Sequence, residues 1–238
     1  ILMPSSRLLA SSAFSASEWS LKPSGLMATI LARFRSTTAT ALEAVSTSTS
    51  DTAAGTGARK IDVFGLDANW NEITEEVVMN GTGAVALVNS YTRLYRIRVI
   101  ESGTYATQSA QSHVGDIIIR ETGGGDEWAR IDSTLFPMGQ SEIGVISIPA
   151  GKTAFIENII ITVNATKSSD LLFFRRENID TVTAPFSTMR LFYSIVGLQG
   201  PFTLTPEVPY VVPEKSDFGF LGRVTAQTGN ISVEMNII

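Results

Sequence analysis

The residues Gly151-Lys152-Thr153 match the end of the phosphate-binding loop pattern G-x-x-x-x-G-K-[ST]. The full pattern needs a glycine where this chain has Ile146. It also needs a following helix, because the amide groups of the helix N-terminus hold the phosphate. The segment from Ala154 to Ile161 is predicted to be a strand instead. The sequence therefore does not predict a nucleotide site here.

Two other motifs suggest catalysis at first sight. Asp217-Phe218-Gly219 has the letters of the kinase metal-binding tripeptide, but the other kinase motifs are missing from the sequence, so we interpret it as the start of a strand. His113 is the only histidine, and it lies in a polar segment without a nucleophile-elbow pattern. We predict an exposed or hydrogen-bonded loop histidine. The chain has no cysteine, which excludes disulfides, thiolate catalysis and cysteine-ligated metal.

Six carboxylates fall near one predicted hairpin and could bind Ca²⁺, which takes oxygen ligands flexibly: Asp51, Asp62, Asp67, Glu72, Glu75 and Glu76. A solvated hairpin face is the preferred interpretation, because Glu75 and Glu76 point to opposite faces of a strand. We expect no metal, no cofactor and no enzymatic activity. A hydrolase of surface polymer stays open as an alternative, although no catalytic pair of carboxylates can be nominated.

Aromatic and arginine side chains are enriched at interface hot spots. Trp70 and the run Phe173-Phe174-Arg175-Arg176 are the candidates of this kind. Strand alternation places one of the two phenylalanines in the core, so at most one of them is a free surface anchor.

The elements that position these residues begin after a boundary segment, in which the Ser/Thr run of residues 46–50 and a glycine-containing turn at residues 51–57 precede a period of two that starts at Arg59. Arg59 to Leu66 predicts a strand that buries Ile61 and Val63. A polar turn follows at residues 67–72, and Thr74 to Met79 predicts the return strand. Asn80-Gly81 then predicts a hairpin with residues 84–88.

The remaining chain continues with short strands and frequent turn signals. In Tyr91 to Ile100, alternation places Leu94 on the outer face and Ile97 on the core face. Asn158 to Val163 suits a buried strand. Gly123-Gly124-Gly125 marks a turn, and a final hairpin is expected around residues 227–229. Further strands are predicted at residues 114–121, 128–131, 143–148, 153–163, 170–175, 189–196, 217–224 and 231–237.

About a dozen strands without a sustained helical period predict an all-β fold, and a jelly-roll-like β-sandwich with an extended N-terminal arm is favoured. Residues 1–50 would form the arm, with one short helix at residues 26–34. Residues 51–238 would form the sandwich, either as one body or as two packed halves, 59–135 and 140–238.

Charge and hydropathy exclude two classes of partner. The net charge is −5 without a basic block, whereas nucleic-acid affinity comes largely from neutralising phosphates, so no nucleic acid is expected. No run approaches the roughly 18–20 apolar residues of a membrane helix, so no membrane is expected either. The composition of residues 1–46 also mimics an organellar transit peptide.

Several segments together resemble a family of virion structural proteins of tailed phages, many of them from marine or aquatic hosts. The segments are Gly57-Ala-Arg59, Gly65-Leu-Asp67, Trp70-Asn-Glu72, Asn80-Gly81, residues 149–156, residues 214–217 and the closing strand at residues 231–237. The resemblance covers residues 47–238 and implies an all-β virion protein with no known catalysis. It favours an arm or an ordinary extension over a transit peptide for residues 1–46.

The resemblance implies a non-enzymatic virion component, with the virion, assembled in the host cytoplasm, as its location. We expect a capsid decoration or cement protein that binds the head lattice through its N-terminal arm. Its partners would be further copies of itself, for which a trimer suits virion symmetry, and the major capsid protein or other virion proteins. The alternative is a tail, neck or fibre module that binds host glycan or receptor through loops at residues 102–113 or 122–128.

Overall fold

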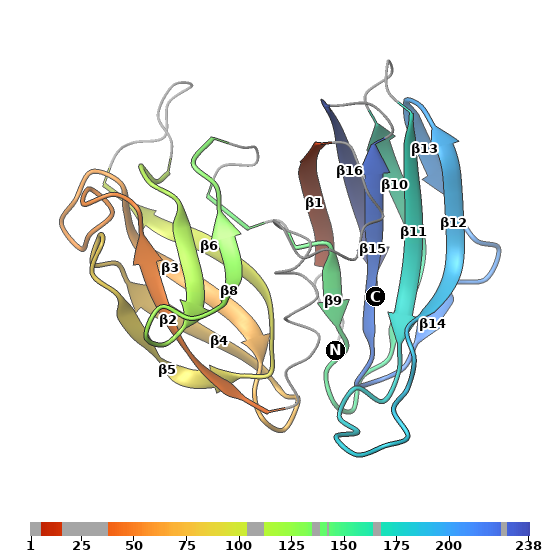
Figure 1. The fold of residues 1–238 in the computed structure, drawn as a ribbon, viewed down its shortest axis with the longest axis horizontal. Coiled ribbons are helices and arrows are strands. Elements are labelled where there is room, and N and C mark those ends of the chain that lie inside the picture. The colour runs from red at the N-terminus through yellow and green to blue at the C-terminus, as the bar shows by residue number, and fades with distance from the viewer. Residues whose placement is uncertain are drawn as a thin grey trace. The chain divides into compact units, whose positions relative to one another are not determined.

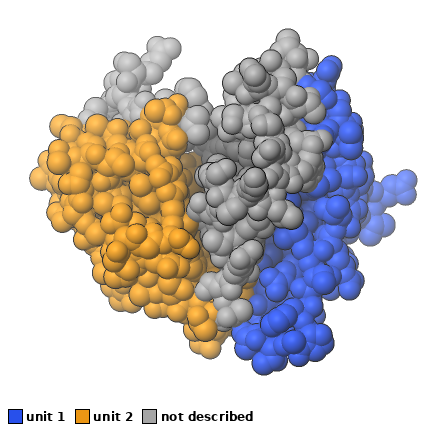
Figure 2. Space-filling model, in the orientation of Figure 1, with its two compact units in different colours: residues 1–22, 143–238 blue, residues 23–142 orange. Residues whose placement is uncertain are grey.

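The computed structural model describes residues 6–15, 38–103, 112–134, 139–141, 143–163, 168–224 and 228–238 (Figure 1). Over these residues the chain is all-β, with sixteen strands, no helix and antiparallel pairing throughout. The chain divides into two compact units, coloured blue and orange in Figure 2. Unit 1 comprises Ile1–Lys22 and Ile143–Ile238, and unit 2 comprises Pro23–Glu142. Jelly-roll connectivity stays a prediction.

Unit 2 contains two sheets. Its four-stranded sheet has the order β5-β2-β7-β8, and its three-stranded sheet has the order β4-β3-β6. Each sheet buries a row of side chains, which includes Ile61, Ile97 and Ile119. The strands are β2 (Thr40–Ser46), β3 (Ala58–Leu66), β4 (Glu72–Val78), β5 (Val85–Tyr91), β6 (Arg93–Ser102), β7 (Ile117–Glu121) and β8 (Glu127–Ile131).

Unit 1 also contains two sheets. The first runs β1-β16-β10-β13, with β14 also paired to β10, and the second runs β12-β11-β15-β9. Side chains from both sheets form one core around Ile161, Phe173 and Val233, so unit 1 is sandwich-like. The strands are β1 (Ser6–Ser15), β9 (Val145–Ser147), β10 (Ala154–Val163), β11 (Ser169–Arg176), β12 (Arg190–Leu198), β13 (Pro201–Leu204), β14 (Tyr210–Val212), β15 (Asp217–Val224) and β16 (Thr228–Ile237).

The expected arm over residues 1–50 is wrong in part. Residues 40–46 form β2, an inner strand that pairs with β5 on one side and β7 on the other. Leu42 and Ala44 are fully buried, so small and apolar side chains in a Ser/Thr-rich segment build a core strand. Residues 6–15 form β1, which pairs with β16 of unit 1. The short helix expected at residues 26–34 lies outside the described residues.

Two predicted hairpins are connections between sheets. Asn80-Gly81 follows β4, but β4 pairs with β3 and the next strand, β5, pairs with β2. Gly81 has φ +60°, its amide donates to the Asp51 carbonyl at 2.6 Å, and its own carbonyl accepts the Ser46 amide, so the turn forms a corner. Likewise β15 pairs with β11 and β9, whereas β16 pairs with β10 and β1.

Two strands depart from simple alternation because each contains a register shift. In β6 one of three shifts lies between the pairs Phe64↔Arg96 and Gly65↔Leu94, and it turns both Leu94 and Ile97 inward. The prediction of Leu94 on the outer face is therefore wrong. In β10 the shift lies between Ile156 and Asn158. Beyond it, Ile159 and Ile161 are buried while Ile160 is exposed, so this strand buries one face only.

Candidate interaction surface

Gly151 lies in a turn. The Lys152 amide donates to the Pro149 carbonyl at 3.3 Å, Gly151 has φ +72°, and β10 begins at Ala154. The Gly151 amide donates to the Glu214 carboxylate at 2.5 Å. In a phosphate-binding loop this amide would donate to the phosphate, whereas here it donates to the Glu214 carboxylate.

The other two catalytic-looking motifs have structural surroundings. Asp217 starts β15, as predicted, and is buried, where it accepts a hydrogen bond from the Ser147 hydroxyl at 2.5 Å. His113 is only 1% exposed, so of the two predicted alternatives, an exposed or a hydrogen-bonded loop histidine, the structure bears out the second. Its Nδ1 lies 3.0 Å from the Ser112 hydroxyl. Asp217 thus connects β15 to β9, whereas the hydrogen bond of His113 stays within its own loop.

The six carboxylates do not gather into one site. Asp62 pairs with Arg98 at 2.8 Å, Glu76 pairs with Lys60 at 3.0 Å, and Asp67 accepts the Asn69 amide of its own turn. No group of three or more His, Cys, Asp or Glu side chains suited to a metal ion occurs in the part of the chain that the structure describes. Nor does that part contain a helix long and apolar enough to cross a membrane.

Asp51 is fully buried and connects three segments of unit 2. Its carboxylate accepts hydrogen bonds from the Ser46 hydroxyl and from the amides of Ala58, Val114 and Gly115, at 2.5–3.0 Å. Four donors balance the cost of burying the charge. Asp51 therefore holds the boundary segment after β2 against the segment before β7.

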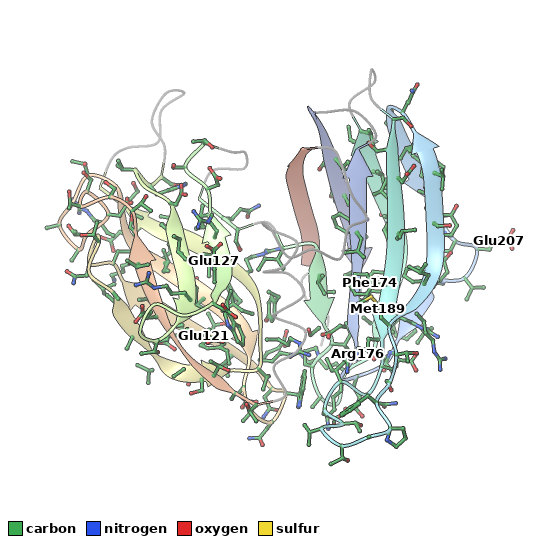
Figure 3. All side chains as sticks on the ribbon, in the orientation of Figure 1. Glu121, Glu127, Phe174, Arg176, Met189 and Glu207 are labelled. Carbon is green, nitrogen blue, oxygen red and sulfur yellow. The ribbon has the colours of Figure 1, made fainter. Side chains whose placement is uncertain are left out.

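The expected aromatic anchors are buried. Trp70 is 5% exposed at φ +66°, and the Arg93 guanidinium lies 5.1 Å from its ring centre. Phe173 belongs to the core of unit 1, and Phe174 is also buried, on the opposite face of β11. Figure 3 shows Arg176 and Met189 near Phe174, where the Arg176 guanidinium donates to the Ser187 carbonyl at 3.1 Å. Neither phenylalanine is a free surface anchor, which agrees with the prediction of at most one, and the candidate Trp70 is not a free anchor either.

Of the two loops expected to bind a host ligand, the β7–β8 turn lies within the described residues, whereas residues 104–111 of the other loop do not. The buried Glu43 carboxylate accepts the Gly123 amide at 3.0 Å and pairs with Arg120 at 2.7 Å. The hydrogen bond from the Gly123 amide lowers the pKa of Glu43 most, and the bond from Arg120 lowers it further. Gly123 and Gly124 both have positive φ. The Glu43 carboxylate thus holds this turn in place, while the residues at its tip are exposed.

Unit 1 exposes a row of apolar side chains that the sequence reasoning missed. Phe155 and Ile238 exchange backbone hydrogen bonds of 2.9 and 3.0 Å, and Phe155 is the register partner of Val211 on β14. Their exposed fractions are 42%, 61% and 47%. Directly opposed residues of neighbouring strands stand about 5 Å apart, so the three form a continuous apolar row. Ala154-Phe155-Ile156 is apolar throughout, so the sequence did not show which side chain faces outward.

Other exposed apolar side chains of unit 1 lie on β12 and on the loops beside these strands. Val196 of β12 is 80% exposed and Leu191 is exposed as well. The β11–β12 loop exposes Val182, Phe186 and Met189, and Val208 is exposed in the β13–β14 loop, from which Glu207 points outward in Figure 3. Large exposed apolar areas mark surfaces that meet other proteins. The arrangement in unit 1 suits docking.

No protein-family model matches the sequence, and a search among curated proteins finds no match. The resemblance to phage virion proteins therefore depends on the sequence segments quoted above.

Proposed function

We propose that this protein is a non-enzymatic structural component of a phage-type virion, a decoration protein of the capsid that binds the head lattice. The observation that carries the proposal is the apolar row of Phe155, Val211 and Ile238 on an all-β unit. An apolar sheet face of this kind is held in place by the strands and can lose its bound water when a partner surface covers it. The segments that resemble virion proteins support the same role, with the major capsid protein as the partner.

The first test is the copy number of the protein in purified particles, measured by quantitative mass spectrometry. A copy number close to that of the major capsid protein supports decoration of the head. A far lower copy number would contradict decoration and place the protein at the neck, tail or fibres. Absence from particles would overturn the virion role altogether.

A matched pair of variants tests the row itself. F155S removes the central apolar side chain of the row, whereas V88S removes an even more exposed apolar side chain from unit 2. We expect particles to retain V88S as they retain the natural protein and to lose most of F155S. Equal retention of both variants would exclude the row as the attachment surface.

A second candidate function rests on the β7–β8 turn, whose tip is fixed by Glu43. A rigid, exposed turn on a β scaffold can bind host glycan or receptor, as a tail, neck or fibre module would. Binding to a glycan array that disappears when residues 122–126 are replaced by a shorter turn would favour this function.

A further inference from the structure

Strand β1 belongs to unit 1 by pairing but is separated from it along the chain. It pairs with β16 without a register shift, from Ser6↔Ile237 to Ser15↔Thr228. The next strand, β2, belongs to unit 2, and the rest of unit 1 begins at Ile143. Among the described residues, β1 is thus the only element of unit 1 that precedes unit 2.

The place of β1 at the edge of its sheet makes it separable from the core. It pairs with β16 alone, and β16 pairs on its other side with β10. The core face of β16, with Ile231, Val233 and Met235 fully buried, packs within the sandwich of residues 143–238. Without β1, the sandwich would remain and the backbone of β16 would lose its partner along one side.

A bare β16 would be an unprotected edge, which proteins normally avoid. Four other edges in the described part of the chain carry protection. The Glu75 carboxylate accepts the amides of Val88 and Asn89 on β5, residues 139–141 cover β6, and β13 is short and begins with Pro201. The β12 edge is interrupted by two register shifts. For β16, the cover is a strand supplied from elsewhere in the sequence.

The same ladder forms whether β1 comes from its own chain or from a neighbour. Residues 16–37 connect β1 to the described part of unit 2, and a connection of that length spans up to about 75 Å when extended. Exchange of an identical element is a low-cost route to an oligomer, because it needs no new interface. We propose that β1 is exchanged between copies of this chain, so that each copy completes the five-stranded sheet of another.

The absence of cysteine from the sequence allows a direct test. Ser11 and Ser232 are register partners, so S11C/S232C places two thiols across the β1–β16 pair. In the control, S11C/N236C, the second thiol lies four residues off register, about 13 Å away and beyond disulfide reach. Both variants are refolded at several concentrations, oxidised, and analysed by non-reducing gel and mass spectrometry.

We expect covalent dimers of S11C/S232C, in a fraction that rises with the protein concentration during refolding, and almost none from the control. A cross-linked monomer at every concentration would overturn the exchange, because β1 would then pair only within its own chain. Lack of any cross-link would overturn it too, since β1 would not lie on β16.

A mixture of two single variants gives independent evidence. S11C and S232C chains of different mass are refolded together and oxidised. A covalent heterodimer requires β1 of one chain on β16 of the other, and only homodimers or monomers would contradict exchange. These results do not depend on virion attachment, which the copy number tests separately.

Discussion

At the scale of single residues, buried carboxylates act as connectors in unit 2. Asp51 accepts four hydrogen bonds, and Glu43 holds the β7–β8 turn through Gly123 and Arg120. In the sequence, such carboxylates look like metal-binding or catalytic residues, because the sequence does not show which hydrogen-bond donors surround them. Their partners in space include backbone amides that are as many as 80 residues away.

We expect D51N to destabilise unit 2 by about 3 kcal/mol. The asparagine NH₂ group would face amide or hydroxyl donors, because both carboxylate oxygens of Asp51 accept hydrogen bonds. D67N is the control, since an asparagine oxygen can still accept the Asn69 and Asn71 amides of this exposed turn. Urea unfolding followed by tryptophan fluorescence measures both, and equal midpoints would contradict the role of Asp51.

Glu43 makes the stability of unit 2 depend on pH. Its pKa in the folded protein lies below the ordinary value of 4.5, so its contribution is present above that pH and is lost as the pH falls through the folded value. We expect the urea midpoint to fall between pH 7 and about pH 3 by more in the natural protein than in E43Q. The outward-pointing Glu207 provides the control variant, E207Q. An equal fall in all three proteins would contradict the prediction.

At the scale of elements, the free edge of a sheet can be protected by a side chain as well as by a strand. Glu75 of β4 accepts the amides of Val88 and Asn89 and the Tyr91 hydroxyl at 2.6–3.2 Å. Burial first, and then Glu75, raises the pKa of Tyr91, so this phenol stays protonated as a donor. A side chain of one sheet thus takes the place of a missing strand at the edge of the other.

We expect E75A to cost about 1–2 kcal/mol and to promote association through the opened β5 edge. E76A is matched to it, because Glu76 is the next residue of the strand and makes only a surface ion pair with Lys60. Light scattering during a thermal ramp checks the difference. Aggregation of both variants at the same temperature would show that Glu75 does not protect β5.

Most strands after residue 57 were predictable from the sequence, whereas β1 and β2, and the pairing of strands that are distant in the sequence, were not. Alternation identified β3 with Ile61 and Val63 buried, and the Asp67 turn that joins it to β4. The same local signals at Asn80-Gly81 do not distinguish a hairpin from a corner between two sheets. That choice depends on where distant strands such as β2 lie. Trp70 shows the same limit, since Arg93, whose guanidinium lies over the Trp70 ring, is distant from it in the sequence.

At the scale of the whole molecule, each unit has its own buried core. We expect F173A, which empties part of the core of unit 1, to lower the stability of unit 1 by about 3–5 kcal/mol. I119A is the counterpart in unit 2. Calorimetry should show two transitions, each lowered by its own variant. Trp70 and Trp128 are buried in unit 2, so fluorescence should follow I119A more than F173A. A single transition that both variants shift equally would contradict this prediction.

The separation of β1 from β16 along the chain has a consequence for synthesis on the ribosome. At about 5–20 residues per second, β1 leaves the ribosome some tens of seconds before its partner strand is translated. All of unit 2 emerges in between. A finished copy from an earlier ribosome on the same messenger RNA presents its β16 during that interval. Translation of many chains side by side therefore favours the exchanged pairing over the one within a single chain, in a way that dilute refolding would not reproduce.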